Sequence, residues 1–276
     1  SERSGFRHIY LHKTEGPEIF QITKGNWEVG DIIGYDDSKK QIYYTSYENS
    51  PLEKHIYRID IDGKNKTDLI PETGMHSAQF STDFSYFLHI TSDINTPATY
   101  TIRNNSGSIE RVVENNSALV ARLKEYKISK VEFGQLPIAT GEKLNYYMIK
   151  PANFDPAKKY PMLMFVYGGP GSQQVLNSWG GSNMMWHQML ANENGYIIAC
   201  VDNSGTGARG AAFKKITYKQ MGKFESDDQI AAAMYFGGQS FIDATRIGIW
   251  GWSYGGFMSS TCLMKGADVF KAAIAV

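Results

Sequence analysis

The sequence predicts two successive regions of different fold class. Residues 1–120 are expected to form blades of an all-β propeller, and residues 121–276 an α/β region with a mostly parallel sheet and helices on both faces. Three observations support this division. Short alternating runs between turn residues fill the first region, a spacing near 46 residues recurs within it, and buried strand patterns alternate with helical patterns in the second.

Composition and charge limit the classes of function. The 276 residues include 28 Lys and Arg and 28 Asp and Glu, so the formal net charge is zero, which argues against a nucleic-acid or anionic-membrane binder. The longest apolar run, residues 162–167, is far below the roughly 20 residues of a bilayer span. Cys200 and Cys262 have apolar neighbours and are expected to be buried free thiols. No metal-ligand cluster or phosphate loop is apparent, so no metal or cofactor is expected.

The first region repeats itself. The tripeptide His-Ile-Tyr at residue 8 returns at residue 55, residues 46–51 return as 92–97, and a third copy of the strand starts at Tyr100. Strands are expected over residues 7–11, 41–45 and 54–60. Units of about 40–50 residues with four strands are typical of propeller blades, and the alternative is a stack of two β-sandwich hairpins. Because propellers close with about 4–8 blades, we expect further blades outside this chain.

The second region alternates strands with helices, which predicts an open α/β sheet. The expected strands are residues 130–133, 144–150, 160–167, 196–202, 246–250 and 271–276. The expected helices are residues 117–126, 184–194, 224–236 and 255–265. Gly195 is expected to end the second of these helices.

The chemistry of this region centres on Gly251-Trp252-Ser253-Tyr254-Gly255, a G-x-S-x-G pattern between a predicted strand and a predicted helix. A nucleophile in this context sits on a very tight turn with its hydroxyl pushed out above the sheet, and only glycine fits on either side of it. The following helix points its N-terminus at the site, which favours developing negative charge. Ser253 is therefore the predicted nucleophile. A plain glycine-rich connection is the alternative.

A second motif fits the same reaction. The strand at 160–167 ends in Tyr167-Gly-Gly-Pro-Gly171, where an α/β hydrolase supplies part of its oxyanion hole. The Tyr167 hydroxyl is a neutral proton donor, and it would stabilise a tetrahedral oxyanion together with the backbone N–H of Tyr254. The alternative for Tyr167 is a packing role at the strand end.

These motifs, with residues 5–9, 22–29 and 224–230, resemble the prolyl oligopeptidase superfamily of serine peptidases, and within it the dipeptidyl peptidase IV group. The resemblance covers nearly the whole chain. It implies an N-terminal β-propeller, a C-terminal α/β-hydrolase domain, and release of N-terminal dipeptides with Pro or Ala at the penultimate position. It also implies a homodimer that is secreted, periplasmic or membrane-anchored. By motif, Ser253 matches the nucleophile, Tyr254 the residue giving the oxyanion amide and Tyr167 the residue giving the oxyanion hydroxyl.

Two features depart from the family pattern. Ser204 stands where the family often has Arg, which puts the local loop contacts in question. The triad order in α/β hydrolases is Ser, then Asp or Glu, then His, yet the residues after Ser253 include Asp268 and no His. The six histidines all precede Ser253, and none is predicted to be the general base. The first five are interpreted as packed or solvated residues, and His187 lies in a predicted helix beside Trp186. With the family's amino-terminus-binding glutamates also missing, we expect an internal piece of a longer enzyme that is inactive alone.

Two other functions fit the pattern. One is a related acylaminoacyl peptidase or oligopeptidase of the same architecture. The other is a catalytically inactive propeller–hydrolase used as an interaction module, although such proteins tend to lose the nucleophile and Ser253 is intact. An extracytoplasmic location is expected, with the cytoplasm as the alternative. The glycosylation patterns at Asn65, Asn104 and Asn115 add little, because chance matches are expected in an Asn-rich chain.

Overall fold

The computed structural model describes residues 1–276, apart from the side chains of residues 18, 19, 181 and 182. The chain divides into two compact units. The first unit comprises Ser1–Arg122 together with the short segments Leu176–Trp179 and Ala208–Ala211, and the second comprises the remaining residues. The predicted domains, 1–120 and 121–276, do not foresee these two short segments.

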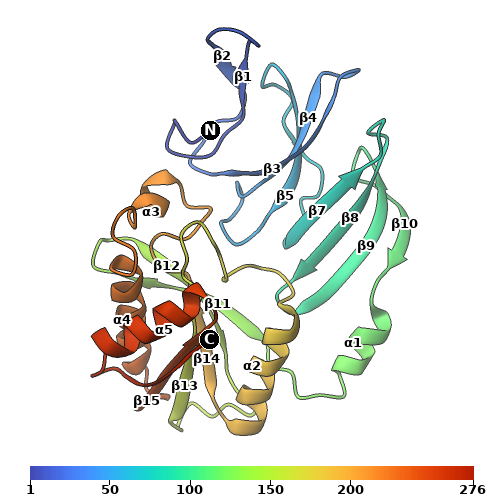
Figure 1. Cartoon of the computed structure of the whole chain (residues 1–276). Coiled ribbons are helices and arrows are strands. Elements are labelled where there is room, and N and C mark those ends of the chain that lie inside the picture. Colours follow the sequence, from blue (N-terminus) through green and yellow to red (C-terminus); the bar gives the residue numbers. More distant parts are fainter. The chain divides into compact units, whose positions relative to one another are not determined.

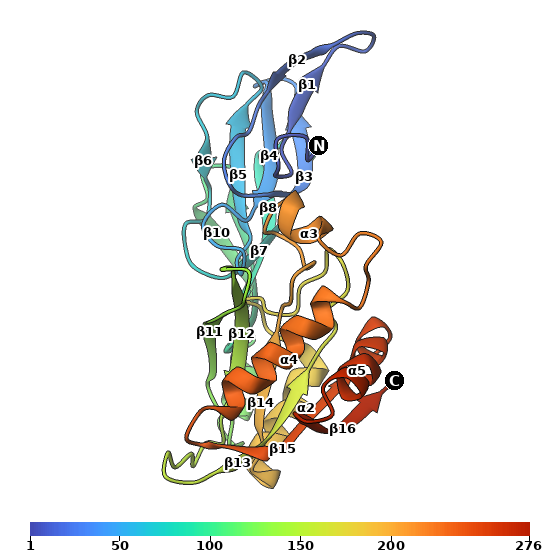
Figure 2. The same cartoon turned by 90° about the vertical axis from the view of Figure 1, so that its left-hand side faces the viewer.

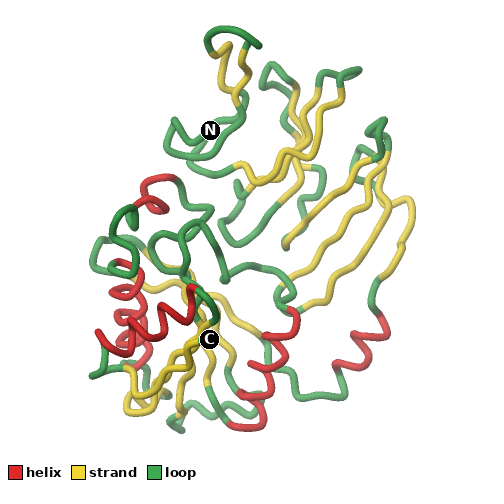
Figure 3. Tube along the Cα trace, in the orientation of Figure 1, coloured by secondary structure: helices red, strands yellow, loops and turns green.

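The first unit is built from antiparallel strands, and its residues before α1 are strands and loops only (Figures 1 and 3). A two-stranded sheet pairs β1 with β2, and two four-stranded sheets have the orders β3-β4-β5-β6 and β10-β9-β8-β7. The bounds are β1 Tyr10–His12, β2 Glu18–Gln21, β3 Val29–Asp36, β4 Gln41–Ser46, β5 His55–Asp60, β6 Thr67–Asp68, β7 Met75–Phe80, β8 Tyr86–Asp93, β9 Thr96–Asn104 and β10 Ile109–Glu114.

The sequence repeat corresponds to a structural repeat. His55 begins β5, the third strand of its sheet, and Tyr100 lies in β9, the third strand of the next sheet. Residues 46–51 and 92–97 span the corresponding connection from second to third strand in each sheet. The strands predicted at 41–45 and 54–60 are confirmed, whereas the strand predicted at 7–11 begins only at Tyr10.

The two faces of β4 explain how the sheets stack. Tyr43 and Tyr44 are both fully buried, and neighbouring residues of a strand point to opposite faces. Tyr44 belongs to the apolar layer shared with β1 and β2, which contains Ile9 and Ile22. Tyr43 belongs to the layer shared with the next sheet, which contains Phe87. A sheet that is apolar on both faces is stable only when both are covered.

The second unit contains a six-stranded sheet of order β11-β12-β14-β13-β15-β16. The pairs β13–β14, β13–β15 and β15–β16 are parallel, and the pairs β11–β12 and β12–β14 are antiparallel. The strands are β11 Val131–Pro137, β12 Lys143–Ile149, β13 Tyr160–Phe165, β14 Ile197–Val201, β15 Ile242–Gly251 and β16 Phe270–Ala275. The helices of this unit are α2 Gly181–Asn194, α3 Ala211–Lys215, which begins at the last residue of a first-unit segment, α4 Phe224–Gly237 and α5 Tyr254–Lys265, whereas α1 Ser117–Leu123 lies almost wholly in the first unit.

Helices lie on both faces of this sheet (Figures 1 and 2). The rings of Phe165 in β13 and Trp250 in β15 lie 5.4 and 5.5 Å from the ring of His187 in α2. The alternate strand residues, such as Met164 and Ile249, share an apolar cluster with residues of α4 and α5. Since alternate residues of a strand face opposite sides, α2 covers one face and α4 and α5 the other.

Several local expectations are confirmed and others are corrected. Gly195 ends α2 in the left-handed region with φ of 72°. Cys200 and Cys262 are buried and free. The helix expected over residues 117–126 ends at Leu123, and α3 was not expected. None of the described helices is long and apolar enough to cross a bilayer.

Candidate active site

Ser253 lies on a strained turn between β15 and α5. Its backbone has φ of 58° and ψ of −116°. Positive φ is uncommon for a residue with a Cβ atom and persists only where surrounding structure holds it. This conformation is the one expected for a nucleophile on a strand-to-helix elbow.

The glycines of the motif are required by one close contact. A Cβ atom at either Gly251 or Gly255 would collide with the backbone carbonyl oxygen of Val166, just after β13. The Val166 N–H in turn donates to the Trp250 carbonyl at 3.0 Å. The elbow is therefore packed directly against the end of β13, and this brings it next to the residue after Val166, which is Tyr167.

The Ser253 hydroxyl is exposed and unused. Ser253 occupies the N-cap position of α5 but makes no side-chain capping bond, although serine normally caps in this way. Its backbone is held instead, because its N–H donates to Val276 at 2.7 Å and its carbonyl accepts from Gly256 and Phe257. Among the described residues, no hydrogen bond involves the hydroxyl. The backbone is thus fixed while the hydroxyl is available for reaction.

Two tyrosines lie at the elbow and differ in how their own hydroxyls are used. The rings of Tyr167 and Tyr254 are 6.1 Å apart and inclined by 45°. The Tyr254 hydroxyl donates to Glu225 Oε1 at 2.8 Å, and burial followed by this hydrogen bond raises the pKa of Tyr254. The Tyr167 hydroxyl and the Tyr254 backbone N–H have no hydrogen-bond partner within the described part of the chain. Two uncommitted donors of this kind are what an oxyanion hole needs.

The loop that follows Tyr167 is held by residues 202–207. The Asp202 carboxylate accepts the N–H groups of Gln174 and Val175 at 2.9 and 3.0 Å. Asn203 Nδ2 donates to the Gly168 carbonyl at 3.1 Å. Backbone bonds add Gly171 N–H to the residue 205 carbonyl at 2.8 Å and Gly207 N–H to the residue 172 carbonyl at 3.0 Å. The sequence pattern predicts no role for Asp202 or Asn203.

One contact of the loop at Ser204 does not use the side chain that departs from the family pattern. The Ser204 backbone N–H donates to Asp228 Oδ2 of α4 at 2.7 Å. Burial is the main cause that raises the pKa of Asp228. Since this bond uses the backbone of residue 204, it does not depend on which side chain stands there.

No described histidine of the second unit fits the role of general base. His187 is 1% exposed, its Nε2 accepts from Trp250 Nε1 at 3.2 Å, and burial lowers the pKa of His187 to about 4. Asp268 lies exposed between α5 and β16, where its carbonyl accepts from Lys271. The interpretation of His187 as a packed residue is therefore supported by its aromatic surroundings.

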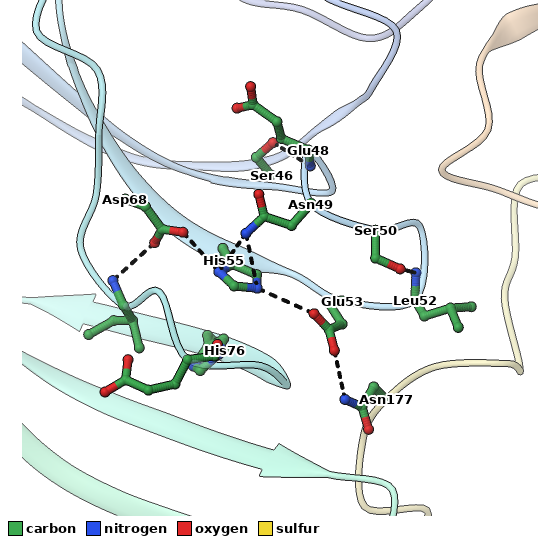
Figure 4. Close-up of polar contacts among 12 residues, drawn as sticks. Ser46, Glu48, Asn49, Ser50, Leu52, Glu53, His55, Asp68, His76 and Asn177 are labelled. Atoms are coloured by element: carbon green, nitrogen blue, oxygen red, sulfur yellow. Dashed lines mark hydrogen bonds and ion pairs between the residues drawn. The ribbon is translucent and has the colours of Figure 1, made fainter. Parts of the chain in front are cut away.

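The first unit holds a polar cluster that the sequence analysis missed (Figure 4). His55 Nδ1 contacts Asp68 at 2.9 Å and His55 Nε2 contacts Glu53 at 3.5 Å, so both ring nitrogens face carboxylates. Glu53 Oε1 also accepts from Asn177 Nδ2 at 2.8 Å. His76 packs its ring 5.1 Å from that of His55. No group of described His, Cys, Asp and Glu side chains has an arrangement that could hold a metal ion.

Comparison with known proteins defines the class. Residues 182–276 match the prolyl oligopeptidase family, and residues 1–98 match the dipeptidyl peptidase IV N-terminal region. The chain is thus similar to the prolyl oligopeptidase family over the region that contains the elbow at Ser253.

Particular relatives narrow the resemblance to dipeptidyl peptidase 4. The chain is 34% identical to a probable dipeptidyl peptidase 4 of Aspergillus flavus and 36% identical to dipeptidyl peptidase 4 of Trichophyton equinum, over 99% of its own length in both cases. The crystal structure of Porphyromonas gingivalis dipeptidyl peptidase 4 superposes with a TM-score of 0.94 at 43% identity over the whole chain. The chain spans 36% of the length of those two curated relatives and 38% of that crystallised chain.

Proposed function

We propose that the protein carrying this chain is a serine dipeptidyl peptidase that releases Xaa-Pro or Xaa-Ala dipeptides from peptide N-termini through an acyl-enzyme on Ser253. The observation that carries the proposal is the exposed Ser253 hydroxyl on a positive-φ elbow, next to two uncommitted donors. The similarity to dipeptidyl peptidase 4 over 99% of the chain supports the substrate class.

The chain's own residues account for the attack and for charge stabilisation. Ser253 Oγ bonds to the carbonyl carbon of the penultimate residue, and the carbonyl oxygen becomes the oxyanion. The Tyr167 hydroxyl and the Tyr254 N–H donate to that oxygen, where the N-terminus of α5 also favours negative charge. The bond to the amine then breaks as the amine takes up the proton that the general base received from Ser253, and water hydrolyses the dipeptidyl ester. The general base that takes the Ser253 proton is not among the described residues of the second unit.

The fold supports a matching architecture. We propose that the two four-stranded sheets are blades of a β-propeller and that the six-stranded sheet belongs to an α/β-hydrolase domain. Four antiparallel strands per repeat support the first assignment. The strand–elbow–helix arrangement of β15, Ser253 and α5 supports the second.

Activity and labelling assays test the function. The purified full-length protein that carries this chain should cleave Gly-Pro and Ala-Pro p-nitroanilides and should be labelled at Ser253 by a fluorophosphonate. Preference for an acetyl-alanyl anilide would indicate the related acylaminoacyl peptidase instead. Labelling that fails at Ser253 would favour the inactive interaction module.

Assembly and location follow from the family resemblance alone. We propose that the protein acts as a homodimer outside the cytoplasm. Light scattering on the purified protein would test the first point, and cell fractionation with an activity assay the second. A monomer in solution or activity confined to the cytoplasm would contradict the corresponding part.

A further inference from the structure

Helix α4 carries an unusual set of buried polar side chains. Glu225, Ser226, Asp228 and Gln229 are all buried, although they lie in the first two turns of a helix, where such residues normally face water. These residues belong to the segment 224–230, which the proposed function leaves without a role. Burying polar groups costs free energy unless they make hydrogen bonds, so the partners of these side chains show what the helix holds.

Glu225 holds the side chain of Tyr254. It is 0% exposed, its Oε1 accepts from the Tyr254 hydroxyl at 2.8 Å, and its Oε2 accepts no hydrogen bond from any described residue. A buried carboxylate with one neutral donor is a poor source of stability, even at a helix N-terminus that favours its charge. The bond ties down the ring of Tyr254, whose backbone N–H is one of the two uncommitted donors.

Gln229 holds the loop that carries Tyr167. It lies four residues after Glu225 and therefore on the same helix face. Its Nε2 donates to Asn203 Oδ1 at 3.0 Å and to the Val201 carbonyl at 2.9 Å. Asn203 Nδ2 in turn donates to the Gly168 carbonyl at 3.1 Å, so Gln229 is linked to Gly168 through Asn203.

The contact at Gly168 is close and specific. Gly168 has φ of 73°, and a Cβ atom there would lie 2.6 Å from Asn203 Oδ1. Asn203 and Gln229 are both 0% exposed, so the chain of bonds is shielded from water. Gly168 directly follows Tyr167, which links this chain of bonds to the second uncommitted donor.

We infer that α4 is the common support of both oxyanion donors, with Glu225 positioning Tyr254 and Gln229, through Asn203, positioning Tyr167. This inference rests on the proposed function of Ser253. Both are positioning residues, because neither reaches the reacting atoms. Misplacing a catalytic group by about 1 Å costs on the order of 100-fold in rate, so such supports affect kcat without touching substrate.

The test compares kcat and KM of variants of the full protein with Gly-Pro p-nitroanilide. Glu225→Leu and Gln229→Met keep the side-chain size and remove the hydrogen bonds, and each should lower kcat by about 10- to 100-fold with little change in KM. Glu225→Gln, which can still accept from the Tyr254 hydroxyl, should restore most of the rate. The matched control is Asp227→Asn, because Asp227 lies in the same helix turn but is exposed and pairs with Lys265.

A double-mutant cycle separates positioning from a general loss of structure. In a Tyr167→Phe background, Gln229→Met should cost little more, because the donor it positions is already gone. Glu225→Leu should still cost its full factor there, because it acts through Tyr254. Equal losses for Gln229→Met in both backgrounds, or equal losses for Glu225→Leu and Glu225→Gln, would overturn the inference.

Replacement variants and a labelling assay test the inference even if a first variant does not fold. If Glu225→Leu or Gln229→Met fails to fold, Glu225→Asp and Gln229→Glu replace them, since the first shortens the reach to Tyr254 and the second repels Asn203 Oδ1. The rate of fluorophosphonate labelling at Ser253 should fall in parallel with kcat. A wild type that is labelled but cleaves no dipeptidyl anilide refutes only the proposed substrate class, whereas a wild type that is not labelled refutes both.

Discussion

The polar cluster around His55 in the first unit and the elbow of the second unit differ in how many hydrogen bonds are left to make. In the cluster, both nitrogens of His55 face carboxylates, and Glu53 Oε1 is bonded to Asn177 (Figure 4). At the elbow, the Ser253 hydroxyl and two nearby donors are uncommitted among the described residues. Histidine beside aspartate suggests catalysis by residue type, yet these groups are already satisfied. Uncommitted groups on a rigid backbone therefore distinguish the proposed active site from the cluster better than residue type does.

The neighbouring histidines His76 and His89 are also fully hydrogen-bonded. His76 Nε2 donates to the Glu72 carbonyl at 2.8 Å, which leaves His76 Nδ1 to accept from His89 Nε2 at 2.9 Å. His89 Nδ1 then accepts from the Thr101 hydroxyl at 3.4 Å. Both rings must be neutral for this order of donors and acceptors to hold. The ring nitrogens of His76 and His89 are therefore all used in hydrogen bonds.

The largest expected effect is at the nucleophile. Ser253→Ala should lower kcat by about 10⁶-fold, because the covalent route is lost. Thermal unfolding should be nearly unchanged, because the hydroxyl makes no bond with the described residues. Anilide hydrolysis and differential scanning fluorimetry measure the two effects. A large loss of stability would show that the Ser253 hydroxyl has a structural role, and the elbow would then no longer differ from the hydrogen-bonded cluster of the first unit.

The next effect concerns the uncommitted phenol. Tyr167→Phe should lower kcat by about 10²- to 10³-fold with a small change in KM, because only the transition state carries the oxyanion. Steady-state kinetics with Gly-Pro p-nitroanilide would show this. The control is Tyr10→Phe, since the Tyr10 hydroxyl bonds to Ser4 at an exposed site of the first unit. Near-normal turnover of Tyr167→Phe would leave Tyr167 with a packing role only.

A backbone contact should give a smaller effect on stability. Gly255→Ala puts a Cβ atom against the Val166 carbonyl, and overpacking of this kind costs about 1–3 kcal/mol. Denaturant unfolding would measure the loss, and reduced labelling of Ser253 should accompany it. Gly195→Ala is the matched control, because nothing lies within 4 Å of its Cβ position, although its φ of 72° carries backbone strain. Full labelling of Gly255→Ala would contradict the idea that this contact shapes the elbow.

The smallest effect is a pH dependence of opposite sign at two histidines. The pKa of His89 is lowered to about 3, mainly by burial. The neutral His89 ring therefore contributes fully to the free energy of unfolding above the unfolded-state pKa near 6.5, and this contribution is lost as the pH falls below 6.5. The pKa of His55 is raised, mainly by its hydrogen bond with Asp68. The charged His55 ring therefore contributes to the free energy of unfolding below pH 6.5, and this contribution is lost as the pH rises through the raised pKa.

Stability profiles of two variants measure these signs. His89→Gln should flatten the loss of stability between pH 6.5 and 4, and His55→Gln should destabilise by about 1–2 kcal/mol near pH 6 and by less at high pH. Thermal melts across this pH range, with wild type as the reference, provide the comparison. If the stability of both variants changed with pH in the same way, the neutral state of His89 and the charged state of His55 in the folded protein would be contradicted.

Much of the site was predictable from local pattern. Gly251 and Gly255 around Ser253 determine the elbow, because backbone crowding at one turn is a local property. Gly195 as a helix end and the recurrence of β5 in β9 are local in the same sense. Glu225 and Gln229 gave no such signal. Their partners, Tyr254 and Asn203, lie 29 and 26 residues away in the chain, and only packing decides such pairs.

By itself, the sequence predicted Ser253 as the nucleophile, most strands and helices of the second unit apart from α3, and the family resemblance, since these depend on neighbouring residues. Tertiary structure alone decided which donors are left uncommitted and which polar groups support them. The Tyr254 hydroxyl, and not that of Tyr167, has a hydrogen-bond partner because Glu225 of α4 lies next to it. Tyr167 lies at the elbow because Gly251 and Gly255 pack against Val166, the residue before it. Hydrogen bonds over such separations follow from the completed packing.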